Sequence, residues 1–217
     1  MKRTISLLLL LGLLLSVAAL YGCGRRAPKL EEIYDRVVEL VEASYELNVI
    51  FYGEGLPYYD RTQPIYSALY GDYTKDKYTK DYNIVSQHAK YRTVEAIKAA
   101  AEQVYSKTLL EETVYPSAFV GLLSSDAGSG VHYANARYLQ DDDQQLYILI
   151  ENESNARISP TPLVYDYSTM KIVRPSNSTR VLISIDAWEE NKPDEILKEQ
   201  LTLTLIDGVW YLDSLTV

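Results

Sequence analysis

The stretch LTLTLIDGVWYLDSL, residues 201–215, decides the fold. Leucine alternates with threonine through its first half, so one face is apolar and the other polar, as in an antiparallel strand with one buried face. The Asp207-Gly208 pair that follows is the strongest hairpin signal in the chain. The sequence therefore predicts a terminal β-hairpin with strands over 199–206 and 209–215.

The two-residue period of this hairpin extends upstream to about Val131. Val181, Ile183 and Ile185 repeat the alternation. Polar turns are expected at Asp141–Gln144 and Pro175–Ser178. The further predicted strands are 132–139, 145–151, 170–174 and 180–188, which together form an antiparallel meander.

The first half of the chain has a helical period instead. Apolar residues from Leu30 to Tyr45 recur at three- and four-residue spacing, which predicts a helix over 29–48. Glycines and a proline at 53–57 end it. Residues 124–130, SSDAGSG, are expected to form a flexible break.

Two shorter helices are predicted before that break. One begins near Thr93 as its cap and carries a buried stripe to Tyr105. The other begins at Thr108, whose spacing to Glu111 fits a capping box, and is stopped by Pro116. Helices followed by an antiparallel meander indicate an α+β fold.

Residues 52–91 hold nine tyrosines in an irregular setting, with a short helical turn expected at 65–70. Aromatic rings beside carboxylates suit glycans or peptide strands, although these rings can equally cover the helices. Tyr58, Tyr59 and Trp188, which precedes the polar turn 189–193, are the candidate ligand-binding residues.

The N-terminus has the layout of an export signal. Lys2 and Arg3 precede an apolar run from Ile5, and the chain's single cysteine is Cys23. The 17 residues 5–21 would span about 26 Å as a helix, against roughly 30 Å for a bilayer core. A transmembrane helix, or a secretory signal with an incidental cysteine, are the alternatives.

Leu20-Tyr21-Gly22-Cys23 resembles the lipobox of bacterial lipoproteins, with Tyr21 where a small residue is usual. The resemblance implies cleavage after residue 22, a lipid (diacylglycerol and palmitate) on Cys23, and anchoring to the extracytoplasmic face of the cell membrane. The expected segments are 1–22 signal peptide, 23–27 lipidated tether, 28–90 helix with the Tyr-rich segment, and 91–217 α+β domain.

The order of elements over 91–217, with its long terminal hairpin, resembles the cystatin-like or NTF2-like roll, in which a curved antiparallel sheet wraps a helix. Residues 94–115, with Val104-Tyr105-Ser106, and the GEGLP stretch at 53–57 resemble uncharacterised lipoproteins of Gram-positive bacteria. More distantly they are similar to secreted inhibitors of cell-wall endopeptidases. This resemblance implies a binding or inhibitory role.

The net charge of the chain and the spacing of its metal-ligating residue types exclude several classes of function. Without residues 1–22 the chain has 30 acids and 19 bases, since Lys2 and Arg3 are removed, a balance of −11. This argues against nucleic acid and against an electrostatic grip on anionic lipid. His88 and His132 are 44 residues apart, and Asp141–Asp143 lacks calcium-loop spacing, so no metal or cofactor is expected.

Three hypotheses remain. The first is a non-catalytic binding or inhibitory lipoprotein at the cell envelope, with peptidoglycan, a wall enzyme or a surface protein as partner. The second is an enzyme using the pocket of an NTF2-like roll, where Asp186, Asp207 and Asp213 are the available acids. The third is an assembly role in which the sheet face forms a dimer.

Overall fold

The structure is a computed structural model that describes residues 26–60, 82–121, 123–126, 130–133, 136–149 and 163–216. The export signal, Cys23 and the helical turn expected at 65–70 lie outside these described residues. Within them, helices and antiparallel sheets confirm the α+β class.

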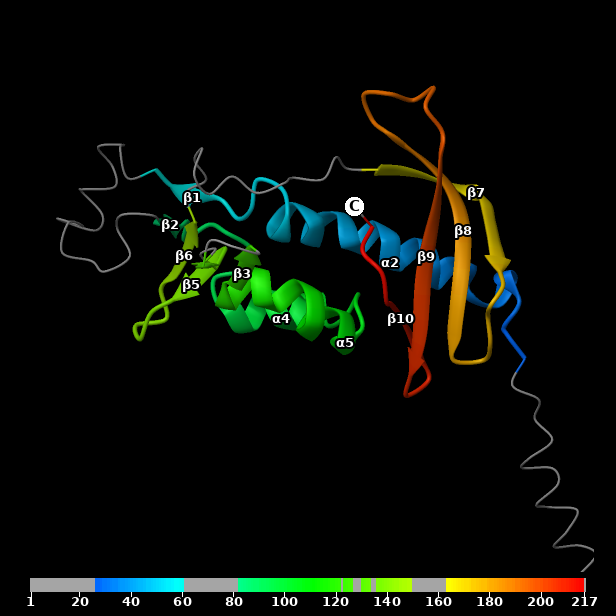
Figure 1. The fold of residues 1–217 in the computed structure, drawn as a ribbon, viewed down its shortest axis with the longest axis horizontal. Coiled ribbons are helices and arrows are strands. Elements are labelled where there is room, and N and C mark those ends of the chain that lie inside the picture. The colour runs from blue at the N-terminus through cyan, green and yellow to red at the C-terminus, as the bar shows by residue number, and fades with distance from the viewer. Residues whose placement is uncertain are drawn as a thin grey trace, which may run out of the picture.

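The longest element is helix α2 (Leu30–Phe51), which runs through the molecule from the C-terminal sheet to a smaller sheet (Figure 1). It confirms the predicted helix and extends three residues beyond its predicted end. Glu32 accepts a hydrogen bond from the backbone N–H of Lys29 (3.0 Å) and so satisfies a free donor at the N-terminus. Its buried stripe includes Ile33, Val37, Leu40, Val41 and Leu47.

The C-terminal sheet confirms the predicted terminal hairpin. Its strands are β7 (Leu163–Val173), β8 (Arg180–Glu189), β9 (Leu197–Ile206) and β10 (Val209–Leu212), antiparallel in the order β10-β9-β8-β7. Asp207 and Gly208 have φ angles of 50° and 83°, the left-handed pair that a tight hairpin turn requires. β7 begins seven residues before the predicted 170–174 strand. β10 ends at Leu212, three residues before the predicted end at 215, although the N–H of Asp213 still donates to the carbonyl of Thr202 in β9 (2.7 Å).

The inner face of this sheet is filled by α2. Ile183 lies opposite Leu201 and Val181 opposite Leu203, and all four are buried with the apolar stripe of the helix in one hydrophobic core. Burial of these side chains, at about 1.5–3 kcal/mol each, is the main stabilising contribution here. The same core includes residues of α2 and of the chain after residue 91.

A second sheet corrects the sequence-based prediction. Its strands are β1 (Tyr58–Tyr59), β2 (Tyr82–Val85), β6 (Leu146–Leu149) and β5 (Tyr138–Gln140), in the order β1-β2-β6-β5. β1 and β2 lie in the segment predicted to be irregular. All four β2 residues are buried, so no polar and apolar alternation marks the strand.

The single strand predicted over 132–139 is also wrong. The chain there forms β4 (Gly130–Tyr133), which pairs with β3 (Leu123–Asp126), and then β5, which pairs with β6. The predicted break at 124–130 is therefore partly a hairpin. The predicted turn at 141–144 is confirmed between β5 and β6.

The helices α4 (Val94–Ala101) and α5 (Lys107–Leu109) precede the β3–β4 hairpin in the chain. Thr93 caps α4 as predicted, with its Oγ1 accepting from the N–H of Ala96 (3.1 Å). Ser106, and not the predicted Thr108, caps α5, because the Ser106 Oγ accepts from the N–H of Leu109 (3.1 Å).

Pro116 does not stop the third helix. After α5 the chain continues as two π-helical turns, η2 (Leu110–Val114) and η3 (Pro116–Val120). Pro116 takes the first position of η3. The N–H at this position has no partner within the helical turn, so its absence in proline costs no hydrogen bond. The turn ends at Gly121, whose φ of 94° favours glycine.

Arg137 closes the C-terminal end of α2 from the second sheet. Its side chain is almost fully buried, and it donates from Nε to the carbonyl of Ile50 (2.8 Å) and from Nη2 to that of Gly53. Tyr138 Oη also donates to Ile50 (2.9 Å). A Cβ on Gly55, whose φ is 84°, would overlap Ile148 and Arg137, so the GEGLP stretch is a packed connection around this guanidinium.

A buried polar cluster joins α2 to the end of the described chain. The Thr216 hydroxyl lies 2.6 Å from Ser44 Oγ and 2.8 Å from Asn48 Nδ2, and Tyr105 Oη donates to Asn48 Oδ1 (3.0 Å). Leu212 meanwhile exchanges backbone hydrogen bonds with Val104 and Ser106. The last residues therefore lie between α2 and the segment that joins α4 to α5.

Replacing Thr216 with Val should destabilise the protein by about 1–3 kcal/mol, because Ser44 and Asn48 lose a partner in a site that excludes water. Urea unfolding followed by circular dichroism measures this. Thr204→Val on the open face of β9 is the matched control and should change stability by at most about 0.5 kcal/mol. Equal stability of the two variants would contradict the role given to the cluster.

Candidate functional site

The structure does not bring the three predicted ligand-binding aromatics together. Tyr58 is 49% exposed on β1, and Tyr59 packs partly against the small core of the β1-β2-β6-β5 sheet. Trp188 lies on β8 opposite Val164, in the other sheet. No common site of these three residues is formed within the described residues.

The acids considered for an enzyme or for a calcium loop have structural surroundings. Asp186 forms an ion pair with Lys198, and Asp207 lies in the hairpin turn. Asp141 holds the β5–β6 turn, accepting from the N–H of Gln145 (2.8 Å) and from Tyr147 Oη (2.8 Å). Among the described residues, no group of histidine, cysteine and carboxylate side chains could hold a metal ion.

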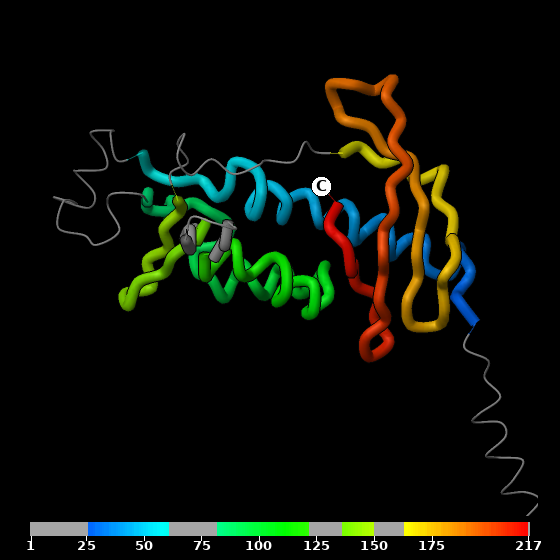
Figure 2. The backbone as a smooth tube through the Cα atoms, in the orientation of Figure 1, coloured from blue at the N-terminus to red at the C-terminus, as the bar shows by residue number. Residues whose placement is uncertain are grey.

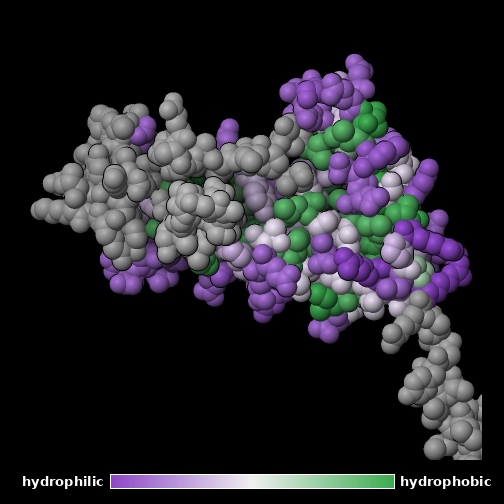
Figure 3. Space-filling view, in the orientation of Figure 1, coloured by the Kyte–Doolittle hydropathy of each residue, from purple (hydrophilic) through white to green (hydrophobic). Residues whose placement is uncertain are grey.

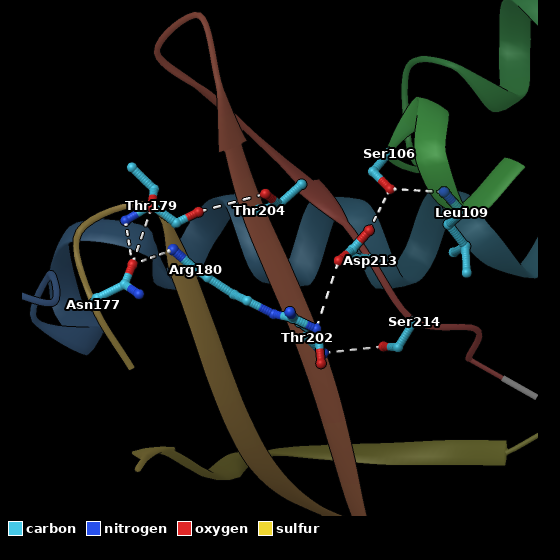
Figure 4. Close-up of polar contacts among 9 residues, drawn as sticks. All are labelled: Ser106, Leu109, Asn177, Thr179, Arg180, Thr202, Thr204, Asp213 and Ser214. Carbon is cyan, nitrogen blue, oxygen red and sulfur yellow. Dashed lines mark hydrogen bonds and ion pairs between the residues drawn. The ribbon is translucent and has the colours of Figure 1, made fainter. Parts of the chain in front are cut away.

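Asp213 is the centre of the contacts drawn in Figure 4. Its carboxylate accepts a hydrogen bond from Ser106 Oγ and lies 3.8 Å from the Arg180 guanidinium. Its N–H donates to the carbonyl of Thr202 (2.7 Å). No histidine takes part in these contacts of Asp213. The serine and the carboxylate therefore connect α5 to the C-terminal sheet, with the geometry of a structural contact.

The best candidate for binding is a groove of about 450 Å³ between α2 and β7. Six of its residues come from α2 at positions that repeat every three to four residues, and therefore lie on one face of the helix. The seventh comes from the middle of β7. The lining residues are Tyr34, Asp35, Val38, Glu39, Glu42, Ala43 and Tyr167.

An irregularity in β7 provides the strand side of this groove. The register between β7 and β8 shifts between Asp166 and Lys171. Within the shift, Asp166 Oδ1 accepts from the N–H of Ser168 (3.0 Å) and its carbonyl accepts from Thr169 Oγ1 (2.7 Å). Bulges of this kind redirect side chains, and here Tyr167 faces the helix.

The groove is acidic. Glu39 pairs with Arg36 (2.9 Å), whereas Asp35 and Glu42 form no ion pair within the described part of the chain. Tyr34 is 36% exposed beside them. An ammonium or guanidinium group placed here would have both carboxylates and ring faces as partners.

Tyr167 in the groove remains neutral well above physiological pH. Burial, the neighbouring Tyr45 and the charge of Glu42 raise the pKa of Tyr167 above the ordinary 10.0. Burial also raises the pKa of Tyr45, although its hydrogen bond with Tyr167 opposes the shift. Tyr167 therefore acts as a hydrogen-bond donor, and the negative charge of the groove comes from its carboxylates.

Sequence reasoning missed this groove. It treated Tyr34 and Tyr45 as part of the core stripe of the first helix and did not single out Tyr167. A usable signal was present in Asp35, Glu39 and Glu42, whose spacing places them along one side of a helix. The contribution of Tyr167 depends on the β7 bulge, which has no local sequence signal.

Comparison with known proteins gives no match among protein-family models, curated proteins or solved structures. Among the described helices, none combines the length and the apolar character needed to cross a bilayer.

Five tyrosines should make the protein unstable at alkaline pH. Burial, as the largest cause, raises the pKa of Tyr45, Tyr105, Tyr115, Tyr165 and Tyr167 in the folded state. The unfolded chain releases these protons near pH 10 while the folded chain retains them. The contribution of these tyrosines to the free energy of unfolding should therefore be fully present below about pH 10. It should fall as the pH rises above that value.

Urea unfolding at a series of pH values from 7 to about 11 measures this dependence. The double variant Tyr165→Phe/Tyr167→Phe should lose less stability over the alkaline interval than the natural chain, because it has fewer retained protons. An identical alkaline slope for the two chains would show that other groups, such as lysines, cause the loss.

Proposed function

We propose that this chain is a lipoprotein held on the extracytoplasmic face of the membrane through Cys23, with a non-catalytic binding or inhibitory role at the cell envelope. The leader and the position of the single cysteine support the anchor. The groove between α2 and β7 supports the binding role. No observation favours the alternative enzyme, since α2 side chains fill the described inner face of the C-terminal sheet.

We further infer that α2 and the β7–β10 sheet form a roll of the cystatin-like or NTF2-like kind. Two features support this: a long helix crosses the inner face of an antiparallel sheet, and the sheet ends in a long hairpin (Figure 1). α4, the π-helical turns and the β1-β2-β6-β5 sheet would then be additions to the roll.

The observation that carries the binding role is the charge and shape of the groove. A volume of about 450 Å³ is enough for a few side chains of a partner. Unpaired carboxylates beside tyrosine rings favour Lys or Arg side chains. A basic segment of another envelope protein, such as a wall enzyme, is therefore the proposed ligand, in preference to the glycan of peptidoglycan.

Lipidation can be tested on protein made in a bacterial host. Mass spectrometry should find a chain beginning at residue 23 with a diacylglycerol on its thiol, and Cys23→Ser should keep its leader and carry no lipid. A transmembrane helix would instead leave the leader attached to an unmodified cysteine. A secretory signal with an incidental cysteine would release a chain with a free thiol.

Binding can be tested with the lysine-rich peptide (Lys-Gly)₆ and its glutamate counterpart. Asp35→Asn/Glu42→Gln should weaken binding of the lysine peptide roughly two- to thirtyfold, since each exposed ion pair contributes about 0.2–1 kcal/mol. Fluorescence anisotropy measures both peptides. Purified peptidoglycan serves as the competing ligand class.

Glu112→Gln/Glu190→Gln is the matched control, because it removes the same net charge at exposed positions outside the groove. The control should bind the lysine peptide like the natural chain. Equal weakening by the two double variants would show that net charge alone attracts the peptide and would remove the groove as the site. Binding of peptidoglycan in place of the peptide would assign the groove to a different ligand.

A further inference from the structure

Four cations gather at the end of the molecule from which the chain leads back to Cys23. Arg26 and Lys29 precede α2, and Lys171 and Arg174 lie at the end of β7. All four are exposed, and within the described part of the chain none of them forms an ion pair. Figure 3 shows hydrophilic side chains at this end of the molecule.

Three of these cations border an open groove of about 1,330 Å³ between the start of α2 and the β7–β8 turn. Figure 2 shows the blue start of the described chain beside this turn. Leu30, Ile172 and Pro175 give the groove an apolar wall. Two acids, Glu31 and Glu32, also line it, and Glu32 is engaged by the backbone N–H of Lys29. The cations therefore outnumber the acids.

The length of the tether determines what this surface faces. Arg26 follows Cys23 by three residues, so their Cα atoms are at most about 11 Å apart. A lipid on Cys23 would therefore hold this groove at the membrane surface. Charges elsewhere on the acidic chain are screened over about 8 Å at physiological salt, so the local cations decide the interaction despite the net charge of the whole.

We propose that this basic groove rests on the headgroups of anionic phospholipids, so that the lipid anchor and the cations together fix one orientation of the domain. The proposal rests on the proposed anchoring at Cys23. Lysine and arginine side chains would bind headgroup phosphates, and the apolar wall would face the headgroup boundary. The net negative charge of the chain predicts no attraction to anionic lipid. The attraction proposed here depends on the local excess of cations at this groove.

The experiment uses the full lipidated chain in vesicles of phosphatidylcholine, either alone or with roughly one third phosphatidylglycerol. A fluorophore is attached to a cysteine introduced at Ser178, in the β7–β8 turn, or at Asn191, in the turn after β8. The ten residues of β8 separate these sites by about 33 Å. Quenching by a headgroup-linked quencher reports which end lies at the membrane.

Quenching should be stronger at position 178 than at 191, and phosphatidylglycerol should increase the difference. Arg26→Gln/Lys29→Gln/Arg174→Gln should abolish this increase, with a loss on the order of fivefold per cation in the ratio of the two orientations. Raising the salt concentration from about 0.05 to about 0.5 M should also reduce the increase that phosphatidylglycerol causes. Lys90→Gln/Arg92→Gln/Lys107→Gln, with the same change in net charge, should leave the increase intact.

Two failures are distinguishable. A protein that floats with neither kind of vesicle lacks the lipid, which overturns the anchoring and this proposal together. If the protein floats with both kinds of vesicle but quenching is equal at positions 178 and 191, only the proposed orientation is overturned. Equal losses in the two triple variants would likewise overturn it, because net charge and not the groove would then be responsible.

Discussion

The constraint on which the rest of the structure depends is the buried hydrogen bonding of Thr216 with Ser44 and Asn48. These polar groups are buried away from water. Each must therefore find a partner inside the protein, or the folded state loses on the order of 1–3 kcal/mol of stability. The partners come from opposite ends of the sequence. Because Tyr105 joins the same cluster, the position of α2 fixes the C-terminal residues and the approach to α5 at once.

Arg137 acts at the other end of the same helix. Burying a guanidinium costs desolvation energy. Here the guanidinium donates hydrogen bonds to carbonyl groups at the C-terminal end of α2, where the helix dipole is negative and favours a cation. The β1-β2-β6-β5 sheet is thereby attached to the helix by hydrogen bonds in addition to apolar packing. α2 thus connects two sheets that share no strand pairing in the described residues.

The parts of the fold that the sequence predicted correctly are those with a local cause. The terminal hairpin follows from leucine and threonine alternation and from Asp207-Gly208, and α2 follows from its apolar stripe. β2 was missed because strands buried on both faces have no alternation, and Pro116 misled because a proline can begin a turn as well as end one. The α2–β7 groove needs both the helix and a bulge distant in sequence, so its residues could not be predicted together.

Under the proposed anchoring, the two surfaces of α2 are related by distance along the helix. The basic groove includes Leu30, and the acidic groove extends from Tyr34 to Ala43, so at 1.5 Å per residue its far end lies about 20 Å along the axis. Glu42, about 18 Å from Leu30, lies beyond the Debye length of about 8 Å at physiological salt, whereas Asp35, at about 7.5 Å, lies within it. Screening therefore separates the far end of the acidic groove from the basic groove, and the near end still feels its charge. A ligand held between α2 and β7 would accordingly lie close to the membrane, which favours membrane-proximal partners over the outer layers of the wall.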